Sequence, residues 1–226
     1  MKKIAVLTAL LFAALQIGYA QKVGLVLSGG GAKGAAHIGV IKALEENGIP
    51  IDYITGTSAG AIVGSLYAMG YTPEEMVELM LSEEFSYWQT GTVENEYKYY
   101  FKRPDPTPEF GHFSIDMTDS LQVKASFLPQ SLINPIQMNQ AFMALFSQAT
   151  AKAGWNFDNL FIPFRCVASD IYSKKAIIFK NGDLGDAVRA SMTFPFFFQP
   201  IWKDSVPIFD GGIYDNFPVG PMKEAF

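Results

Sequence analysis

Apolar residues in this chain occur either in short unbroken runs or at every third or fourth position of longer stretches. The unbroken runs at 22–28 and 51–55 predict strands that are buried on both faces of a parallel sheet. The stretches that follow them, 35–47 and 61–69, have helical spacing. A strand–helix–strand–helix order with short turns is typical of a βαβ unit, so the sequence predicts an α/β fold with a parallel sheet.

The second half of the chain continues with the same two kinds of segment. The predicted elements are a helix from Thr72, a helix from Pro135, strands around Cys166, at 176–179 and at 206–209, and a short helix over 183–192. The helix from Pro135 has an apolar stripe that we expect in the core, formed by Met138, Ala141, Phe142, Leu145, Phe146 and Ala149. No repeat or linker divides the chain, so residues 21–226 are predicted to form one domain.

Between residues 85 and 129 the apolar residues follow neither the unbroken pattern of a buried strand nor the spacing of a helix. This segment mixes prolines and acidic residues with aromatic ones, namely Phe85, Tyr87, Trp88, Tyr97, Tyr99, Tyr100, Phe101, Phe110 and Phe113. A loop of this length in a compact domain is usually functional or contains short elements of its own. Two interpretations stay open: the segment covers an active site or approaches lipid, or it is an irregular insertion with ordinary packing.

The first twenty residues have the pattern of a secretory signal peptide. Lys2 and Lys3 precede an apolar run over 4–17, and the small-x-small sequence of 18–20 is typical of a cleavage site before Gln21. The run is too short and wrongly flanked for a spanning helix. We therefore expect an exported protein; an uncleaved N-terminal anchor is the alternative.

Composition and charge narrow the class of protein. With 49% hydrophobic and 17% charged residues, the chain has enough apolar material for a large core. Removal of Lys2 and Lys3 takes the formal net charge from −5 to −7, which argues against nucleic acid as a partner and requires a local apolar patch for any lipid contact. The single cysteine, Cys166, cannot form an internal disulfide, and we expect it to be a small core residue.

The first candidate catalytic motif lies at the end of the second predicted strand. Residues 56–60 read Gly-Thr-Ser-Ala-Gly and lead into a helix, which is the setting of a nucleophile elbow with Ser58 exposed on a tight turn. Gly56 and Gly60 leave room, because a Cβ at either position would collide with the turn or the neighbouring strand. The pentapeptide alone is common, so its meaning depends on its surroundings.

A glycine-rich loop, residues 29–34, follows the first predicted strand. Its spacing fits a dinucleotide site, but that site needs an acidic residue at the end of the second strand, and Asp52 lies at the wrong end. An oxyanion hole explains the loop better, since glycines expose successive backbone N–H groups at the start of a helix. Both loop and elbow follow parallel strands, so we expect them at the same edge of the sheet.

The sequence leaves open which residue acts as the general base that takes the proton of Ser58. The chain has two histidines, His37 and His112, and neither follows Asp210 as an α/β-hydrolase triad requires. The base is therefore one of these two, a histidine beyond Phe226, or a carboxylate.

With these motifs the chain resembles the patatin-like phospholipase family, which carries a G-G-G-x-[K/R]-G loop, a G-x-S-x-G elbow and a D-G-[G/A] motif. The matching residues include Gly29, Gly30, Gly31, Lys33, Gly34, Gly56, Ser58, Gly60, Asp210, Gly211 and Gly212. Weaker matches are Ala190-Ser191-Met192 with Pro195, and Asn216-Phe217-Pro218. The resemblance implies a three-layer α/β/α sandwich with a mainly parallel central sheet.

The resemblance also implies the roles of the site residues: a catalytic dyad of Ser58 and Asp210, with an oxyanion hole from the amides of Gly29, Gly30 and Gly31. No metal or cofactor is expected. An aspartate can serve as base only if burial raises its pKa, and the aromatic residues at 194–198 are candidates to bury it. Lys33 either attracts a phosphate headgroup or pins the loop by hydrogen-bonding its carbonyl groups.

The functional expectation is a lipid acyl hydrolase that acts on membrane phospholipid or another glycerolipid. A catalytically silent binding domain with the same fold is the alternative, and a nucleotide-binding protein is a more distant one. Exported bacterial members of the family can continue into an outer-membrane β-barrel, so we expect a location in the periplasm, the outer membrane or the cell surface.

Overall fold

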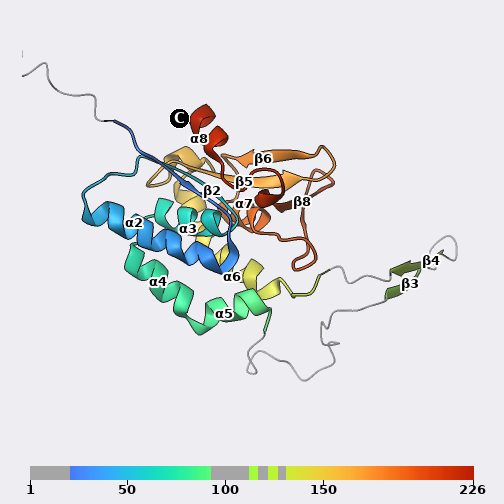
Figure 1. The fold of residues 1–226 in the computed structure, drawn as a ribbon. Helices are drawn as coiled ribbons and strands as arrows, with labels where there is room; N and C mark the ends of the chain where they lie inside the picture. Colours follow the sequence, from blue (N-terminus) through green and yellow to red (C-terminus); the bar gives the residue numbers. More distant parts are fainter. Residues whose placement is uncertain (1–20, 93–111, 117–121, 127–130) are drawn as a thin grey trace, which may run out of the picture.

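A computed structural model describes residues 21–92, 112–116, 122–126 and 131–226 (Figure 1). The predicted signal peptide, 1–20, lies outside the described residues. So does much of the aromatic segment between residues 85 and 129.

A six-stranded mixed sheet forms the centre of the described chain. Its strands are β1 (Gly24–Leu27), β2 (Tyr53–Thr57), β5 (Phe164–Asp170), β6 (Lys175–Phe179), β7 (Ile201–Lys203) and β8 (Val206–Asp210). The strand order is β1-β2-β5-β8-β7, and β6 also pairs with β5. The βαβ prediction is confirmed, because β1, β2 and β5 are parallel, whereas β6 and β8 run antiparallel to β5.

One edge of β5 is shared by two strands that meet end to end. Ala168 pairs with β6 and also with Asp210 of β8, while Cys166 pairs with the same β6 and also with Gly56 of β2. Since β6 occupies one edge of β5, β2 and β8 must both lie along the other edge. The carboxyl ends of β2 and β8 therefore face each other, at Val167 and Ala168 of β5.

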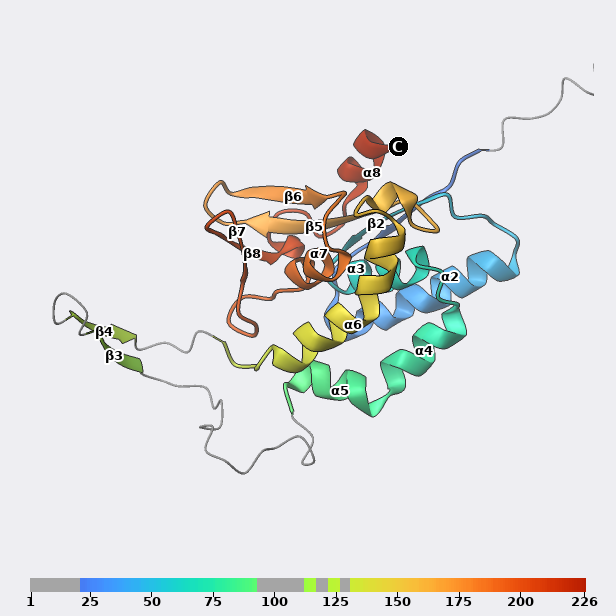
Figure 2. The same ribbon diagram turned by 180° about the vertical axis from the view of Figure 1, so that it is seen from behind.

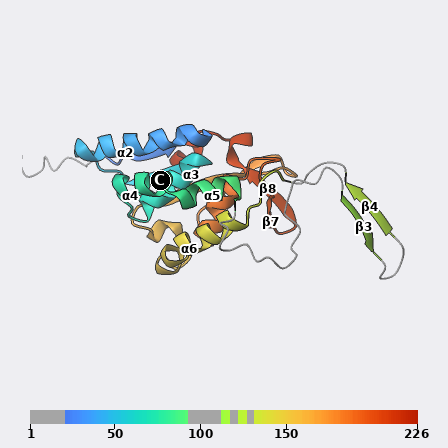
Figure 3. The ribbon, with the colours of Figure 1, turned by 90° about the horizontal axis from the view of Figure 1, so that it is seen from below.

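Helices cover both faces of the sheet. The helical segments are η1 (Gly31–Ala35), α2 (Ala36–Glu46), α3 (Ala59–Ala68), α4 (Pro73–Leu81), α5 (Glu83–Thr90), α6 (Ile136–Lys152), η3 (Phe157–Asn159), α7 (Leu184–Ser191), η4 (Gly211–Ile213) and α8 (Val219–Ala225). In Figures 1 and 2, α3 and α7 lie on one side of the sheet and α8 on the other. Figure 3 shows α4 and α5 between α2 and α6 in the thicker helical layer. The expected three-layer sandwich is confirmed.

The core contains the residues that the apolar pattern selected. Of the predicted stripe on α6, Met138, Phe142 and Phe146 are buried, and Ala141, Leu145 and Ala149 are partly buried. Cys166 is fully buried in β5, and burial raises the pKa of its thiol, so it is a core residue and not a reactive one. The predicted start of α4 is also confirmed, because Thr72 and Glu75 form a capping box.

The structure differs from the prediction at the ends of several elements and in the segment from residue 85. Strand β2 begins at Tyr53 and continues to Thr57, because the Asp52 carboxylate accepts hydrogen bonds from Lys22 and from the Val23 amide and ends the preceding turn. The segment from residue 85 is not wholly irregular: Ser82 caps α5, and a hairpin of β3 (His112–Asp116) and β4 (Gln122–Ser126) lies further along. Helix α5 spans eight residues, which is too short for its spacing to be distinctive.

Candidate active site

Ser58 lies on a strained turn between β2 and α3. Its backbone has φ +55° and ψ −119°, a conformation that residues other than glycine rarely adopt. Glycine is needed on both sides: a Cβ at Gly56 would meet the backbone of Gly60, and a Cβ at Gly60 would meet the Leu27 carbonyl oxygen. The nucleophile-elbow geometry expected from the sequence is therefore present.

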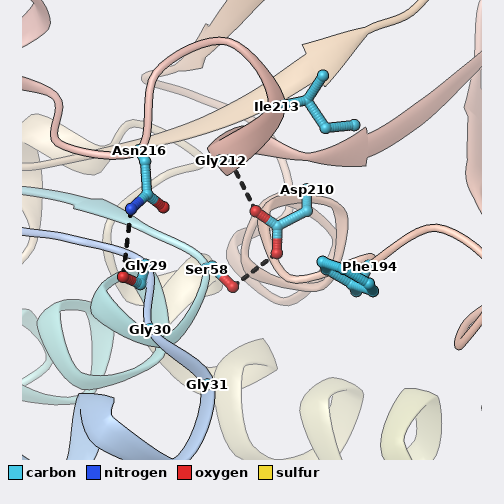
Figure 4. A pocket seen from close by; sticks show the side chains of 9 residues that line it. All are labelled: Gly29, Gly30, Gly31, Ser58, Phe194, Asp210, Gly212, Ile213 and Asn216. Atoms are coloured by element: carbon cyan, nitrogen blue, oxygen red, sulfur yellow. Dashed lines mark hydrogen bonds between the residues drawn. The ribbon is translucent and has the colours of Figure 1, made fainter.

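Asp210 stands at the end of β8, directly across from this turn. Ser58 Oγ donates a 2.6 Å hydrogen bond to Asp210 Oδ2, and the Gly212 amide donates a 2.7 Å bond to Oδ1 (Figure 4). Only 6% of Asp210 is exposed. Burial raises the pKa of this carboxyl above its ordinary value, and the bonds from Ser58 and Gly212 oppose that shift without cancelling it.

The sheet explains how residues so distant in sequence meet. Strand β2 leaves the edge of β5 at Thr57, which pairs with Val167, and β8 arrives at Asp210, which pairs with the next residue, Ala168. An antiparallel β8 is required for this, because its carboxyl end must face the carboxyl end of β2.

The glycine loop forms another wall of the same pocket. A cavity of about 420 Å³ is lined by Gly29, Gly30, Gly31, Ser58, Phe194, Asp210, Gly212, Ile213 and Asn216 (Figure 4). The Gly29 amide donates to the Asn216 carbonyl at 3.1 Å, and Asn216 Nδ2 donates back to the Gly29 carbonyl at 3.4 Å. Within the described chain, the Gly30 and Gly31 amides have no acceptor, so they are the loop donors left for a ligand.

The other residues of the glycine motifs support the loop and the turns from outside the cavity. Gly34 is buried in η1, where a Cβ would collide with Ala59, so it brings the glycine loop close to the elbow helix. Gly211 is buried behind Asp210. Lys33 is exposed in η1, and its two predicted roles, attraction of a phosphate headgroup and pinning of the loop, both stay predictions.

His37 occupies a structural position. Its Nε2 lies 2.9 Å from the Ser28 carbonyl oxygen, and the ring does not line the cavity. The side chain of His112 lies outside the described residues. Within the described residues, no group of histidine, cysteine and acidic side chains is arranged to hold a metal ion.

Ser191 is a site residue whose role was not predicted from the sequence. Its hydroxyl accepts a 2.9 Å hydrogen bond from the Ser58 amide and donates a 2.5 Å bond to the Val167 carbonyl, and it is fully buried. The bond ties the strained turn to β5. The Ala190-Ser191-Met192 match was the available signal, but its purpose depends on contacts across the fold.

Ser191→Ala is expected to lower the free energy of unfolding by about 1–3 kcal/mol, because the Ser58 amide and the Val167 carbonyl would both lose a buried partner. Chemical denaturation measures the change. Ser147→Ala, at an exposed position of α6, is the matched control and should stay within about 0.5 kcal/mol of the wild type. Equal stability of the two variants would show that the hydroxyl does not hold the turn.

Comparison with known proteins assigns the family. A model described as patatin-like phospholipase matches residues 25–223. The chain belongs to the patatin-like phospholipase family. A solved structure, VipD from Legionella pneumophila, shares the patatin-like fold with a TM-score of 0.54 at 18% identity, over 87% of this chain and 47% of VipD.

Two curated relatives are much longer than this chain. Lysophospholipase NTE1 of Pyricularia oryzae is 31% identical over 204 residues, which cover 90% of this chain and 11% of that protein. Patatin-like phospholipase domain-containing protein ZK370.4 of Caenorhabditis elegans is 30% identical over 203 residues, covering 89% of this chain and 12% of that protein. The patatin-like chain thus spans little more than a tenth of the length of these relatives. Among the described residues, no helix is both long and apolar enough to cross a bilayer.

Proposed function

We propose that the protein is a serine lipid acyl hydrolase that cleaves fatty-acyl ester bonds of phospholipids or other glycerolipids through a Ser58–Asp210 dyad. The observation that carries the proposal is the 2.6 Å hydrogen bond from Ser58 Oγ to Asp210 Oδ2 inside the cavity. Membership of the patatin-like phospholipase family supports the substrate class.

In the proposed first step, Ser58 Oγ attacks the ester carbonyl as its proton passes to Asp210. The carbonyl oxygen becomes an oxyanion, and the Gly30 and Gly31 amides are the proposed donors to it. The ester C–O bond then breaks, and Asp210 returns the proton to the departing alcohol. An acyl group is left on Ser58.

The second step repeats this chemistry with water. Asp210 takes a proton from a water molecule, whose oxygen attacks the acyl carbonyl. The bond to Ser58 Oγ breaks, the fatty acid leaves, and the proton returns to Ser58. A carboxylate is an adequate base here because burial raises its pKa and the hydrogen bond fixes its position against the hydroxyl.

The nucleotide-binding alternative receives no support from the site. The Asp52 carboxylate lies at the amino end of β2 and is bonded to Lys22 and to the Val23 amide, so it cannot hold a ribose beside the glycine loop. The amide-lined wall of the cavity instead faces Ser58.

Covalent labelling tests the proposal against a silent binding domain. The purified protein should react with a fluorophosphonate probe at Ser58, and it should release fatty acid from lysophospholipid, diacylphospholipid or monoacylglycerol, as detected by mass spectrometry. Labelling at another residue would contradict the nucleophile assignment. Absence of both labelling and release would favour the silent domain.

We also propose that the protein acts outside the cytoplasm, in the periplasm, the outer membrane or at the surface of a bacterium. The basic start, the apolar run and the small residues before Gln21 support this. The full chain expressed in a bacterium should yield a mature form whose first residue is Gln21, as measured by intact mass. A mass that retains residues 1–20 would favour the uncleaved anchor.

A further inference from the structure

We propose that the aromatic rim of the cavity is the face with which the protein docks on a lipid surface of little net charge. The inference rests on the proposed hydrolase function, because it concerns how a lipid ester reaches Ser58. By the rim we mean the exposed residues Leu132, Phe194, Phe196, Phe197, Ile213, Tyr214 and Phe217.

Two residues of the rim lie in the wall of the cavity. Phe194 and Ile213 line it on either side of Asp210 (Figure 4). The Phe194 ring packs edge-on against Phe197 at 5.6 Å, which extends the apolar surface away from the opening. Two further rim residues are sequence neighbours of cavity residues: Tyr214 follows Ile213, and Phe217 follows Asn216.

A second chain segment widens the rim beside Phe196. The Leu132 amide donates to the Phe196 carbonyl at 2.8 Å, and the Ile133 amide donates to the Phe197 carbonyl at 2.9 Å. Leu132 is exposed beside this contact. Leu132 is thus held beside the 194–197 segment, and the 213–217 segment adjoins the same cavity through Ile213. Exposed apolar residues of three separate segments therefore lie near one cavity, whereas singly scattered apolar residues would need no explanation.

The loop from Thr193 to Gln199, called the aromatic loop below, is held with Phe194, Phe196 and Phe197 exposed. Phe196 has φ +69°, an unfavourable backbone conformation for a bulky residue, and its side chain is 69% exposed. Beneath the loop, the buried Arg189 donates to Thr193 Oγ1 at 2.6 Å and to the Gln199 carbonyl at 3.2 Å. Its guanidinium also lies 5.1 Å from the ring centroid of the buried Phe198. The loop is thus anchored at both ends, and the exposure of Phe196 is a fixed feature.

The low charge of the rim segments indicates which kind of lipid surface the rim fits. The segments 131–138, 193–202 and 211–222 together contain one charged residue, Asp215, although 17% of the whole chain is charged. The chain as a whole is negative, at −5, so an anionic membrane would repel it. An uncharged aromatic rim on an acidic protein fits a zwitterionic or neutral lipid surface, where aromatic side chains enter the interfacial region.

The test compares a rim variant with a matched control on two substrates. Phe196→Ser with Phe217→Ser removes one exposed ring from each of two segments of the rim, and neither residue lines the cavity. Trp155→Ser is the control, because Trp155 is also an exposed aromatic residue with positive φ but lies on the turn after α6. Flotation with phosphatidylcholine vesicles measures docking, and turnover of a water-soluble short-chain ester measures the chemistry.

The rim variant should lose roughly tenfold to a hundredfold in vesicle affinity and in hydrolysis of vesicle lipid, with turnover of the soluble ester unchanged. The control should change neither, and 30% phosphatidylserine should not strengthen wild-type binding. Unchanged vesicle affinity of the rim variant would overturn the proposal. So would a wild-type dimer in gel filtration that the rim variant converts to a monomer, because a second copy would then cover the rim. No turnover of the soluble ester by the wild type would refute the hydrolase function, while flotation would still report on docking.

Discussion

Ser58→Ala is expected to lower kcat for ester hydrolysis by at least about 10⁴-fold and to abolish labelling by a fluorophosphonate. The reason is that the hydroxyl is the atom proposed to form the acyl-enzyme, and alanine offers no substitute. The change should leave the fold intact, because the partly buried side chain loses one hydrogen bond, to Asp210, and keeps its Cβ.

Two measurements make this result specific. Circular dichroism and thermal melting should show that the variant remains folded, and Ser147→Ala, on the exposed face of α6, should retain full activity. A folded Ser58→Ala protein that keeps wild-type turnover would eliminate the dyad. A folded protein that loses turnover would agree with the proposal.

Asp210→Asn is expected to reduce kcat by about 10²–10⁴-fold, the range for loss of a general base. Asparagine keeps the shape of the side chain, and its one amide oxygen can still accept the hydrogen bond from the Gly212 amide. Its NH2 group then faces Ser58 Oγ, where it donates a hydrogen bond and cannot take the proton. Asp204→Asn, the same substitution in the exposed turn between β7 and β8, should have full activity. Full activity of a folded Asp210→Asn protein would assign the base to another residue.

The pH dependence follows from the same carboxyl. Asp210 acts as a base only when ionised, so kcat/KM should fall as the pH drops through its pKa. Because burial raises that pKa, the acid limb of the wild-type profile should lie above the ordinary value of 3.8. A limb at or below 3.8 would contradict the raised pKa.

The stability of Asp210→Asn should change in the opposite direction to its activity. The pKa of Asp210 is higher in the folded chain than in the unfolded chain. Its contribution to the free energy of unfolding is therefore fully present at a pH below the unfolded-state pKa, and it is lost as the pH rises through the folded-state pKa. At neutral pH the ionised, buried Asp210 therefore costs stability, and the amide removes that cost. The melting temperature of Asp210→Asn should be higher than that of the wild type at pH 7, and the difference should shrink in acid.

Several features could be predicted from the sequence because they depend on short stretches of chain. The unbroken apolar runs predicted strands, and the spacing along α6 selected the buried face of that helix. The Gly-x-Ser-x-Gly pattern predicted the turn at Ser58, since the close approach of Gly56 and Gly60 to neighbouring backbone follows from local geometry. A raised pKa of Asp210 was the condition that the sequence analysis set for this residue to act as a base, and burial in the structure meets it.

The arrangement of the site depends on contacts between residues that are far apart along the chain. Ser58 and Asp210 are 152 positions apart, Ser58 and Ser191 are 133 apart, and Gly29 and Asn216 are 187 apart. Strand direction decides the first contact: β8 had to run antiparallel to β5 and share its edge with β2, which no local pattern specifies. The same long-range packing pairs the Gly29 amide with the Asn216 carbonyl and brings Phe194 and Ile213 to the wall of one cavity. The sequence by itself determined which chemical groups the protein carries and the turns that expose them, because turns are governed by neighbouring residues. Only the tertiary structure decided which groups meet, because pairing along a sheet edge is governed by the whole fold.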